Sequence, residues 1–168
     1  MTALIIGPNG SGKSACAEKL AVSLQAGAGA LYYIATMVPC GEEGFARVEK
    51  HRRQRARSGF ITLEKTHISG LELPPDAVVL LEDVSNLLGN AMFGAEKSDV
   101  FNDIVSLCEK CRAAVLVSIG GLAESPEYNE ETNAYIAALN RLNERLAGFA
   151  DKTVDMTRIS VCDILKPY

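Results

Sequence analysis

The sequence predicts an α/β fold in which helices flank a mostly parallel β-sheet, and two observations lead to this prediction. Short apolar runs, typical of strands buried on both faces, alternate along the chain with stretches of helical composition. A glycine-rich turn also joins the first apolar run to the first helical stretch. The 168 residues suit one hydrophobic core, so we expect a single domain over residues 1–168.

The first strand is expected at residues 3–6, directly before the glycine-rich turn at residues 7–14. A helix over residues 14–24 follows, with apolar side chains at three- and four-residue spacing. Further strands are predicted at residues 31–35, 78–81 and 113–119, and helical composition is found at residues 42–57 and 100–112.

The longest predicted helix covers residues 126–147. Ser125 is a suitable capping residue, Pro126 suits the first turn, and Gly148 is a typical C-terminal stop. Residues 152–165 have β-rich composition, so the predicted fold has a β-rich C-terminal end.

Composition argues against several classes of protein. Hydrophobic residues make up 48% of the chain and charged residues 23%, which is too apolar for disorder over most of its length. A net charge of −4 argues against a general nucleic-acid binder, and no apolar run reaches the roughly 18 residues of a membrane span.

The five cysteines form no disulfide framework, which favours a reduced, cytoplasmic setting. Cys108 and Cys111 form a C-x-x-C pair, which is more often a pair of small buried side chains than a zinc or redox site.

The glycine-rich turn has the spacing of a phosphate-binding loop, G-x-x-x-x-G-K-[S/T]. Its glycines let the backbone curl around an anion, and amides of the loop and helix start then point at phosphates. Lys13 is expected to reach the β and γ phosphates, and the Ser14 hydroxyl to ligate Mg²⁺. The predicted nucleotide-binding residues here are Gly7, Pro8, Asn9, Gly10, Ser11, Gly12, Lys13 and Ser14. The sequence therefore predicts a P-loop NTPase-like fold that binds ATP or GTP.

An acidic group near the magnesium ion is the second requirement of such a site. The predicted strand at residues 78–81 runs into Glu82 and Asp83, and a carboxylate at a strand end can hold Mg²⁺ directly or through water. We expect this strand to lie beside the P-loop. Whether Glu82 or Asp83 serves the metal stays open, and a solvated strand end is the alternative interpretation.

A basic helical stretch surrounds His51. Arg47, His51 and Arg55 are spaced four residues apart and share one helix face. A solvated helix with a basic end is one interpretation. The other is an anion site, in which neighbouring arginines lower the pKa of His51 by like-charge repulsion and keep its imidazole neutral and nucleophilic.

In this order along the chain, these pieces resemble the bifunctional adenosylcobinamide kinase/adenosylcobinamide-phosphate guanylyltransferase family of cobalamin biosynthesis. The resemblance covers nearly the whole chain. The segments that carry it are the 7–14 loop, Tyr33-Ile34-Ala35-Thr36, His51-Arg52-x-x-Arg55, Thr62-x-Glu64 and Val79 to Asp83. The chain differs at residues 119 and 120, where Ile-Gly stands in place of the family's Asn-Glu.

The resemblance implies two reactions. In the first, nucleotide held by the P-loop phosphorylates the aminopropanol hydroxyl of adenosylcobinamide. In the second, His51 takes GMP from GTP as a phosphoramidate and passes it to adenosylcobinamide phosphate. The resemblance also implies a homo-oligomer, by default a trimer.

By the same resemblance, His51 and Lys13 are the catalytic residues. Arg52, Arg55, Glu64 and Glu82 join the loop in binding nucleotide, and Ser14 and Glu82 bind Mg²⁺. The expected partners are nucleotide and a corrinoid, with no nucleic acid and no membrane span.

Two other functions stay open. One is a divergent P-loop kinase or NTPase that acts on another small molecule, and the other is a GTP-binding regulatory module without turnover. Guanylyl transfer to His51 discriminates the leading hypothesis from both. The chain has no N-K-x-D motif for guanine recognition, so the preference between ATP and GTP stays open as well.

Overall fold

The computed structural model of the chain describes residues 1–25, 27, 29–38 and 58–157. In this part six strands form one sheet in the order β3-β2-β4-β5-β1-β6, and every neighbouring pair is parallel. The strands are β1 (Thr2–Gly7), β2 (Leu31–Ala35), β3 (Phe60–Glu64), β4 (Val78–Glu82), β5 (Ala113–Ile119) and β6 (Lys152–Asp155). The structure thus confirms the predicted α/β fold with a parallel sheet.

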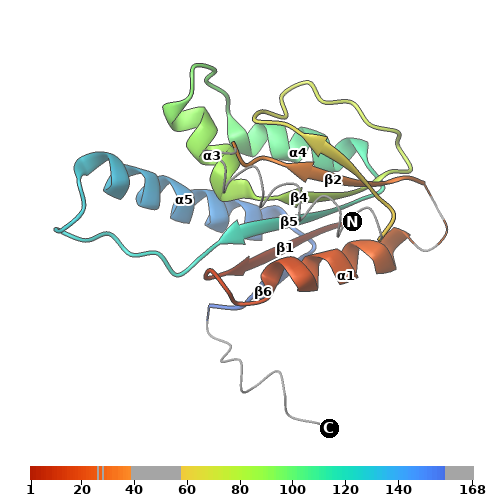
Figure 1. Cartoon of the computed structure of the whole chain (residues 1–168), viewed down its shortest axis with the longest axis horizontal. Helices are drawn as coiled ribbons and strands as arrows, with labels where there is room; N and C mark the ends of the chain where they lie inside the picture. Colours follow the sequence, from red (N-terminus) through yellow and green to blue (C-terminus); the bar gives the residue numbers. More distant parts are fainter. Residues whose placement is uncertain (26, 28, 39–57, 158–168) are drawn as a thin grey trace, which may run out of the picture.

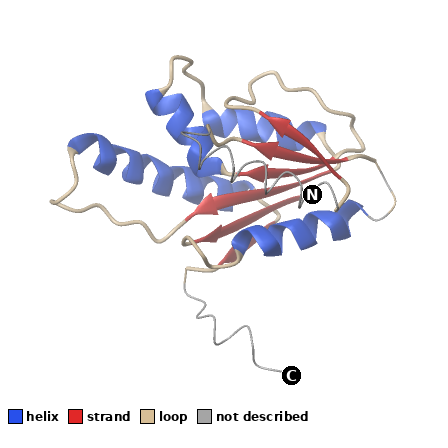
Figure 2. Ribbon diagram, in the orientation of Figure 1, coloured by secondary structure: helices blue, strands red, loops and turns tan. Residues whose placement is uncertain are grey.

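Helices cover both faces of the sheet (Figures 1 and 2). The described helices are α1 (Lys13–Gln25), α3 (Val84–Phe93), α4 (Val100–Lys110) and α5 (Glu130–Phe149). One core cluster joins α1 to β-strand residues such as Ile5 and Leu80, and the other joins α3, α4 and α5 to residues such as Leu4 and Leu81. Successive residues of β1 and β4 therefore enter opposite cores, which explains why these strands are continuously apolar.

Two described elements were absent from the sequence prediction. Strand β3 lies at one edge of the sheet, where Ile61 and Glu64 are exposed, so it has no continuous apolar run. Helix α3 contains Gly89 and two asparagines, which are poor helix formers. Its N-cap and the burial of Val84 and Leu87 stabilise the helix instead.

The predicted start of the longest helix was wrong. Helix α5 begins at Glu130, and the capping residue is Asn129, whose side chain accepts a hydrogen bond from the Thr132 N–H at 2.7 Å. The segment before it forms a turn, in which the Tyr128 N–H donates to the Ser125 carbonyl at 3.1 Å. Ser125 and Pro126 therefore precede the helix.

The predicted end of this helix was also wrong. Gly148 lies within the last turn of α5, and its φ is not among the positive values that a glycine stop requires. The C-cap is Ala150, whose N–H donates to the Leu146 carbonyl at 2.8 Å. Beyond it, β6 pairs with β1 and confirms the start of the predicted β-rich end, whereas residues 158–165 lie outside the described part.

The strand that ends in Glu82, β4, does not pair directly with β1, the strand that leads into the glycine-rich loop. Strand β5 pairs with both β1 and β4 and separates them. The carboxyl ends of all three strands still meet at one edge, because the sheet is parallel. Long side chains from β4 can therefore reach the loop across the end of β5.

None of the described helices is both long and apolar enough to cross a membrane.

Candidate nucleotide site at the carboxyl edge of the sheet

The Gly7–Ser14 loop connects β1 to α1 at this edge. Gly10 and Gly12 have φ values of 78° and 82°, in the left-handed region that side chains other than glycine rarely adopt. The Ser11 N–H donates to the Pro8 carbonyl at 3.2 Å and closes a tight turn. Because α1 begins at Lys13, the unpaired amides of its first turn face the same loop, which is the arrangement that binds anions.

Lys13 lies against the loop rather than in solvent. Its side chain is buried, and Nζ donates to the Pro8 carbonyl at 3.3 Å. The Pro8 carbonyl accepts from one of the three N–H donors of this ammonium group. The hydrogen bond holds the positive charge beside the loop, where a bound phosphate would need it.

Glu82 is held by two hydroxyl groups from different elements. Ser14 Oγ donates a hydrogen bond to Oε1, and the Tyr33 hydroxyl donates to Oε2 at 2.6 Å. Tyr33 comes from β2 and is only 2% exposed. These two hydrogen bonds fix the orientation of the Glu82 carboxylate. Its Oε1 atom is turned towards Ser14, which follows Lys13 in the loop.

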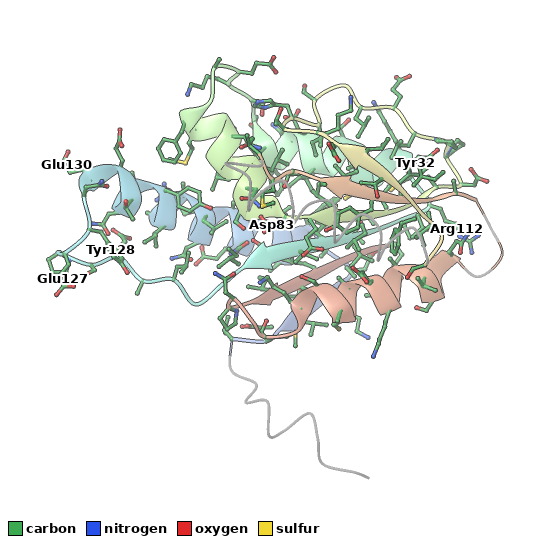
Figure 3. All side chains as sticks on the ribbon, viewed as in Figure 1. Tyr32, Asp83, Arg112, Glu127, Tyr128 and Glu130 are labelled. Carbon is green, nitrogen blue, oxygen red and sulfur yellow. The ribbon has the colours of Figure 1, made fainter. Side chains whose placement is uncertain are left out.

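Asp83 has a different environment. Its Oδ1 accepts hydrogen bonds from the Asn86 N–H at 2.7 Å and from the Ser85 hydroxyl at 2.6 Å, so it caps α3 (Figure 3). Burial raises the pKa of Asp83, against the lowering effect of these two hydrogen bonds. The peptide bond between Glu82 and Asp83 is cis. Of the two carboxylates, only Glu82 is hydrogen-bonded to a described residue of the loop, although the charge of Lys13 also acts to lower the pKa of Asp83.

A hydrogen-bonded brace behind the site ties β2 and β4 together. The Thr36 hydroxyl donates to the Asp83 carbonyl at 2.7 Å and accepts from the Asp83 N–H at 2.9 Å. The Asn90 side chain donates to the carbonyls of Thr36 and Thr66 at 2.9 and 3.0 Å. This brace fixes where the β4 strand turns into α3.

Sequence reasoning assigned no role to Tyr33, Thr36 or Asn90. Tyr33 and Thr36 belong to the Tyr33-Ile34-Ala35-Thr36 segment, which resembles the family only as a segment. A signal for Tyr33 was present, because a tyrosine in a strand buried on both faces needs a partner for its hydroxyl. The sequence offers no way to name that partner, since Glu82 lies 49 residues further along the chain, at the end of another strand.

Glu64 is placed apart from the loop. It ends β3 and helps to line a separate pocket of about 360 Å³, together with Met37, Val38, Lys65, Thr66, His67 and Glu96. No hydrogen bond or ion pair joins Glu64 to the loop among the described residues. Its predicted role in nucleotide binding therefore stays a prediction. His51, Arg52 and Arg55 lie outside the described residues.

The end of β5 closes the other side of the loop. The Gly120 N–H donates to the Gly7 carbonyl at 3.2 Å. A Cβ atom at Gly120 would lie 2.2 Å from Ile6 Cγ2, so this position has no room for a side chain unless Ile6 moves. The Asn143 side chain accepts from the Ser118 hydroxyl and donates to the Ile119 carbonyl, which anchors α5 to the same strand end.

The cysteine pair behaves as a part of the core. Cys108 and Cys111 are both buried in the cluster under α3, α4 and α5, and neither forms a disulfide. Burial raises the pKa of the Cys108 thiol to about 12, which disfavours its thiolate form. No group of three or more His, Cys, Asp or Glu side chains in the described ranges is placed to hold a metal ion by itself.

A family model described as cobinamide kinase / cobinamide phosphate guanyltransferase matches residues 3–159 of the chain. No protein of curated function matches the chain significantly. The family match spans both the loop and the strand end that carries Glu82, as well as His51. The chain belongs to the cobinamide kinase / cobinamide phosphate guanyltransferase family of cobalamin biosynthesis.

Proposed function

We propose that the chain is a nucleotide-dependent transferase that phosphorylates adenosylcobinamide, transfers GMP from GTP to adenosylcobinamide phosphate, or does both. The observation that carries this proposal is the contact of Ser14 with Glu82 beside the buried Lys13. These three side chains have the chemistry that phosphoryl transfer requires at a P-loop, namely a cation for the phosphates and oxygen ligands for a metal. Family membership supports the corrinoid as the acceptor.

The kinase reaction needs positioning and charge neutralisation more than covalent help from the protein. In our proposal, backbone amides of the Gly7–Ser14 loop hold the phosphates, and Lys13 neutralises charge that develops on the β–γ bridging oxygen. The aminopropanol hydroxyl attacks the γ-phosphorus, the bond from that phosphorus to the bridging oxygen breaks, and the nucleoside diphosphate leaves. The hydroxyl proton goes to solvent or to a phosphate oxygen.

The residues fit Mg²⁺ as a cofactor. Ser14 and Glu82 offer a hydroxyl and a carboxylate oxygen, the hard ligands that Mg²⁺ prefers, and bound phosphates would supply others. When bound, the ion would neutralise charge on the β and γ oxygens. Tyr33 holds the second Glu82 oxygen and so keeps the first turned towards the site.

The guanylyl transfer is proposed for His51. Its imidazole nitrogen attacks the α-phosphorus of GTP, the bond to the bridging oxygen breaks, and pyrophosphate leaves. A phosphate oxygen of adenosylcobinamide phosphate then attacks the same phosphorus and releases the imidazole. Arg52, Arg55 and Glu64 are proposed to bind the nucleotide, on the basis of the sequence resemblance. We also propose that the chain forms a homo-oligomer, by default a trimer.

One observation favours a second candidate, a divergent P-loop kinase or NTPase that acts on another small molecule and performs no guanylyl transfer. Gly120 stands where the family resemblance has a glutamate, and Ile6 fills the space that a side chain there would need. The glutamate that could contact substrate or the transferred phosphate is therefore absent, and Ile6 packs in its place. A regulatory module that binds GTP without turnover is the corresponding non-enzymatic outcome.

The deciding experiment incubates the purified protein with Mg²⁺ and GTP that is labelled at the α-phosphate, and counts label after denaturation. Acid-labile, base-stable label that is absent from His51→Ala supports the guanylyl transfer. A parallel incubation with γ-labelled ATP or GTP and adenosylcobinamide tests the kinase step. Product from the second incubation without label in the first favours the kinase alone, and reversible binding without either favours the regulatory module.

A further inference from the structure

Asn143 is a buried amide on the face of α5 that packs against the sheet. Its side chain is only 7% exposed, and every other buried residue of this helix is apolar. Its Oδ1 atom accepts a hydrogen bond from the Ser118 hydroxyl at 2.6 Å, and its Nδ2 atom donates to the Ile119 carbonyl at 2.9 Å. Burial of an amide costs free energy unless its polar atoms find partners. Both partners of Asn143 belong to the last two residues of β5.

This end of β5 extends beyond its neighbour β4. The register of β4 with β5 ends at the Glu82–Val117 pair, whereas the register of β1 with β5 continues to the Gly7–Ile119 pair. The Gly120 N–H faces β1, where it donates to the Gly7 carbonyl. Neighbouring residues of a strand turn their backbone groups to opposite sides, so the Ile119 carbonyl faces the side on which β4 has ended. Asn143 supplies the donor that a longer β4 would have given.

The end of β5 is in turn bonded to the start of the Gly7–Ser14 loop, since β5 and β1 lie side by side (Figure 1). The hydrogen bond from the Gly120 N–H to the Gly7 carbonyl is 3.2 Å long. A Cβ atom at Gly7 would lie 2.6 Å from Ser11 Oγ, so the loop folds back onto Gly7 with no space between them. Ser11 Oγ is buried and has no hydrogen-bond partner within the described residues, so packing sets its position. A shift of Gly7 would therefore move the loop.

We propose that Asn143 is a positioning residue for nucleotide binding, which acts on the Gly7–Ser14 loop through Ile119 and Gly120. This inference rests on the proposed function of the loop. Backbone amides of such a loop bind phosphates through hydrogen bonds, which weaken steeply when their angles depart from alignment. Without Asn143 the buried Ile119 carbonyl loses its donor, and the strand end shifts until this carbonyl finds another. Gly120 and Gly7 move with the strand end, so the loop amides lose their alignment.

Three variants separate positioning from a purely structural role. Asn143→Leu keeps the approximate size of the side chain but removes both of its hydrogen bonds. Ser118→Ala/Asn143→Leu also removes the hydroxyl that Asn143→Leu leaves without its acceptor, and replacing both partners by apolar groups is close to neutral for stability. The Ile119 carbonyl lacks its donor in both variants. Asn140→Leu is the matched control, because Asn140 lies on the same helix and donates to the carbonyl of Leu122, beyond the strand end, at 3.2 Å.

Urea unfolding first gives the stability of each variant and a temperature at which all are folded. Titration calorimetry with ATP and with GTP, each with Mg²⁺, then gives the Kd of the folded proteins. We expect Asn143→Leu and the double variant to raise the Kd about 10-fold, equivalent to the net free energy of roughly one hydrogen bond. The double variant should recover stability without recovering affinity, and Asn140→Leu should bind as wild type does. In the kinase assay the KM for nucleotide should rise and kcat change less, because the loop holds the phosphates in the ground and transition states alike.

The double variant also keeps the proposal testable if Asn143→Leu alone fails to fold. A Kd of wild type in the double variant, an equal rise in Asn140→Leu, or a loss of kcat with unchanged affinity would overturn the positioning role and leave the proposed function standing. A wild type that binds neither ATP nor GTP would overturn the proposed function, and the positioning role with it.

Discussion

Tyr33 and Glu82 meet through a 2.6 Å hydrogen bond between the phenol and carboxylate Oε2, although they come from different strands. Strands β2 and β4 are neighbours, with Ala35 opposite Glu82. Tyr33 lies two residues before Ala35, on the same face of the sheet, and its long side chain reaches the strand end. Since Ser14 holds the other oxygen, Tyr33 is linked to the candidate metal site through Glu82.

Removing the Tyr33 hydroxyl should weaken Mg²⁺ binding selectively. In Tyr33→Phe the ring keeps its buried packing, but Glu82 loses one of the two donors that orient it. Metal affinity typically falls by about 10- to 100-fold when a group that orients a metal ligand is removed. We expect the Mg²⁺ concentration for half-maximal nucleotide turnover or binding to rise by this factor, and high Mg²⁺ to restore the signal.

Tyr32→Phe is the matched control, because Tyr32 is the preceding residue of β2 and points to the other core. It should leave the Mg²⁺ dependence unchanged. Equal effects of the two substitutions, or an effect on nucleotide binding that added Mg²⁺ does not relieve, would argue against an orienting role for Tyr33.

Lys13→Ala should sharply weaken nucleotide binding. The substitution removes a buried ammonium group that lies against the loop. Hydrogen bonds to charged groups contribute about 1.5–3 kcal/mol, which corresponds to roughly a 10- to 150-fold loss of affinity. Titration calorimetry with ATP and GTP measures the change, and Lys19→Ala, at an exposed position of the same helix, should bind as wild type does. Unchanged affinity and activity in Lys13→Ala would contradict the assignment of the loop.

Asp83 should make the protein less stable as the pH rises. Burial raises the pKa of Asp83 above its ordinary value of 3.8. At pH values between the pKa of Asp83 in the unfolded state and its higher pKa in the folded state, the folded state therefore binds more protons than the unfolded state. The free energy of unfolding then falls as the pH rises. Asp83→Asn keeps an N-cap acceptor but cannot ionise.

Urea unfolding of both proteins from about pH 3 to pH 7 isolates this effect, because other carboxylates contribute equally to each. The stability of wild type relative to Asp83→Asn should be highest at the acid end and fall through the window above pH 3.8. A difference that stays constant with pH, or that rises with it, would show that the carboxyl is not destabilised by burial.

Gly120→Ala should destabilise the fold, because its Cβ would meet Ile6 Cγ2 at 2.2 Å. Overpacking of this kind costs about 1–3 kcal/mol. Ile6→Ala removes the clashing methyl group, so the cost of Gly120→Ala should be smaller in that background. Gly148→Ala is the control, since it lies in helix α5 with open space around it and should stabilise by about 0.5–1 kcal/mol. Thermal or urea unfolding that places Gly120→Ala at or above wild type would show that the β5 end has room for a side chain.

The sequence by itself determined the local features of this protein. The apolar runs at residues 31–35 and 113–119 predicted β2 and β5 to the residue, because a strand buried on both faces leaves an unbroken pattern. The G-x-x-x-x-G-K-S spacing predicted a tight loop between β1 and α1, because glycine adopts without steric cost the left-handed backbone found at Gly10 and Gly12.

Only the tertiary structure decided which distant groups meet. Glu82 continues the face of Leu80 that packs on α1, whereas Asp83 starts the turn into α3, and no local pattern shows which face α1 covers. In the same way, the insertion of β5 between β1 and β4 and the pairing of Tyr33 with Glu82 depend on strand order. Strand order is set by the packing of the whole chain, so contacts between residues far apart in sequence cannot be read from either segment alone.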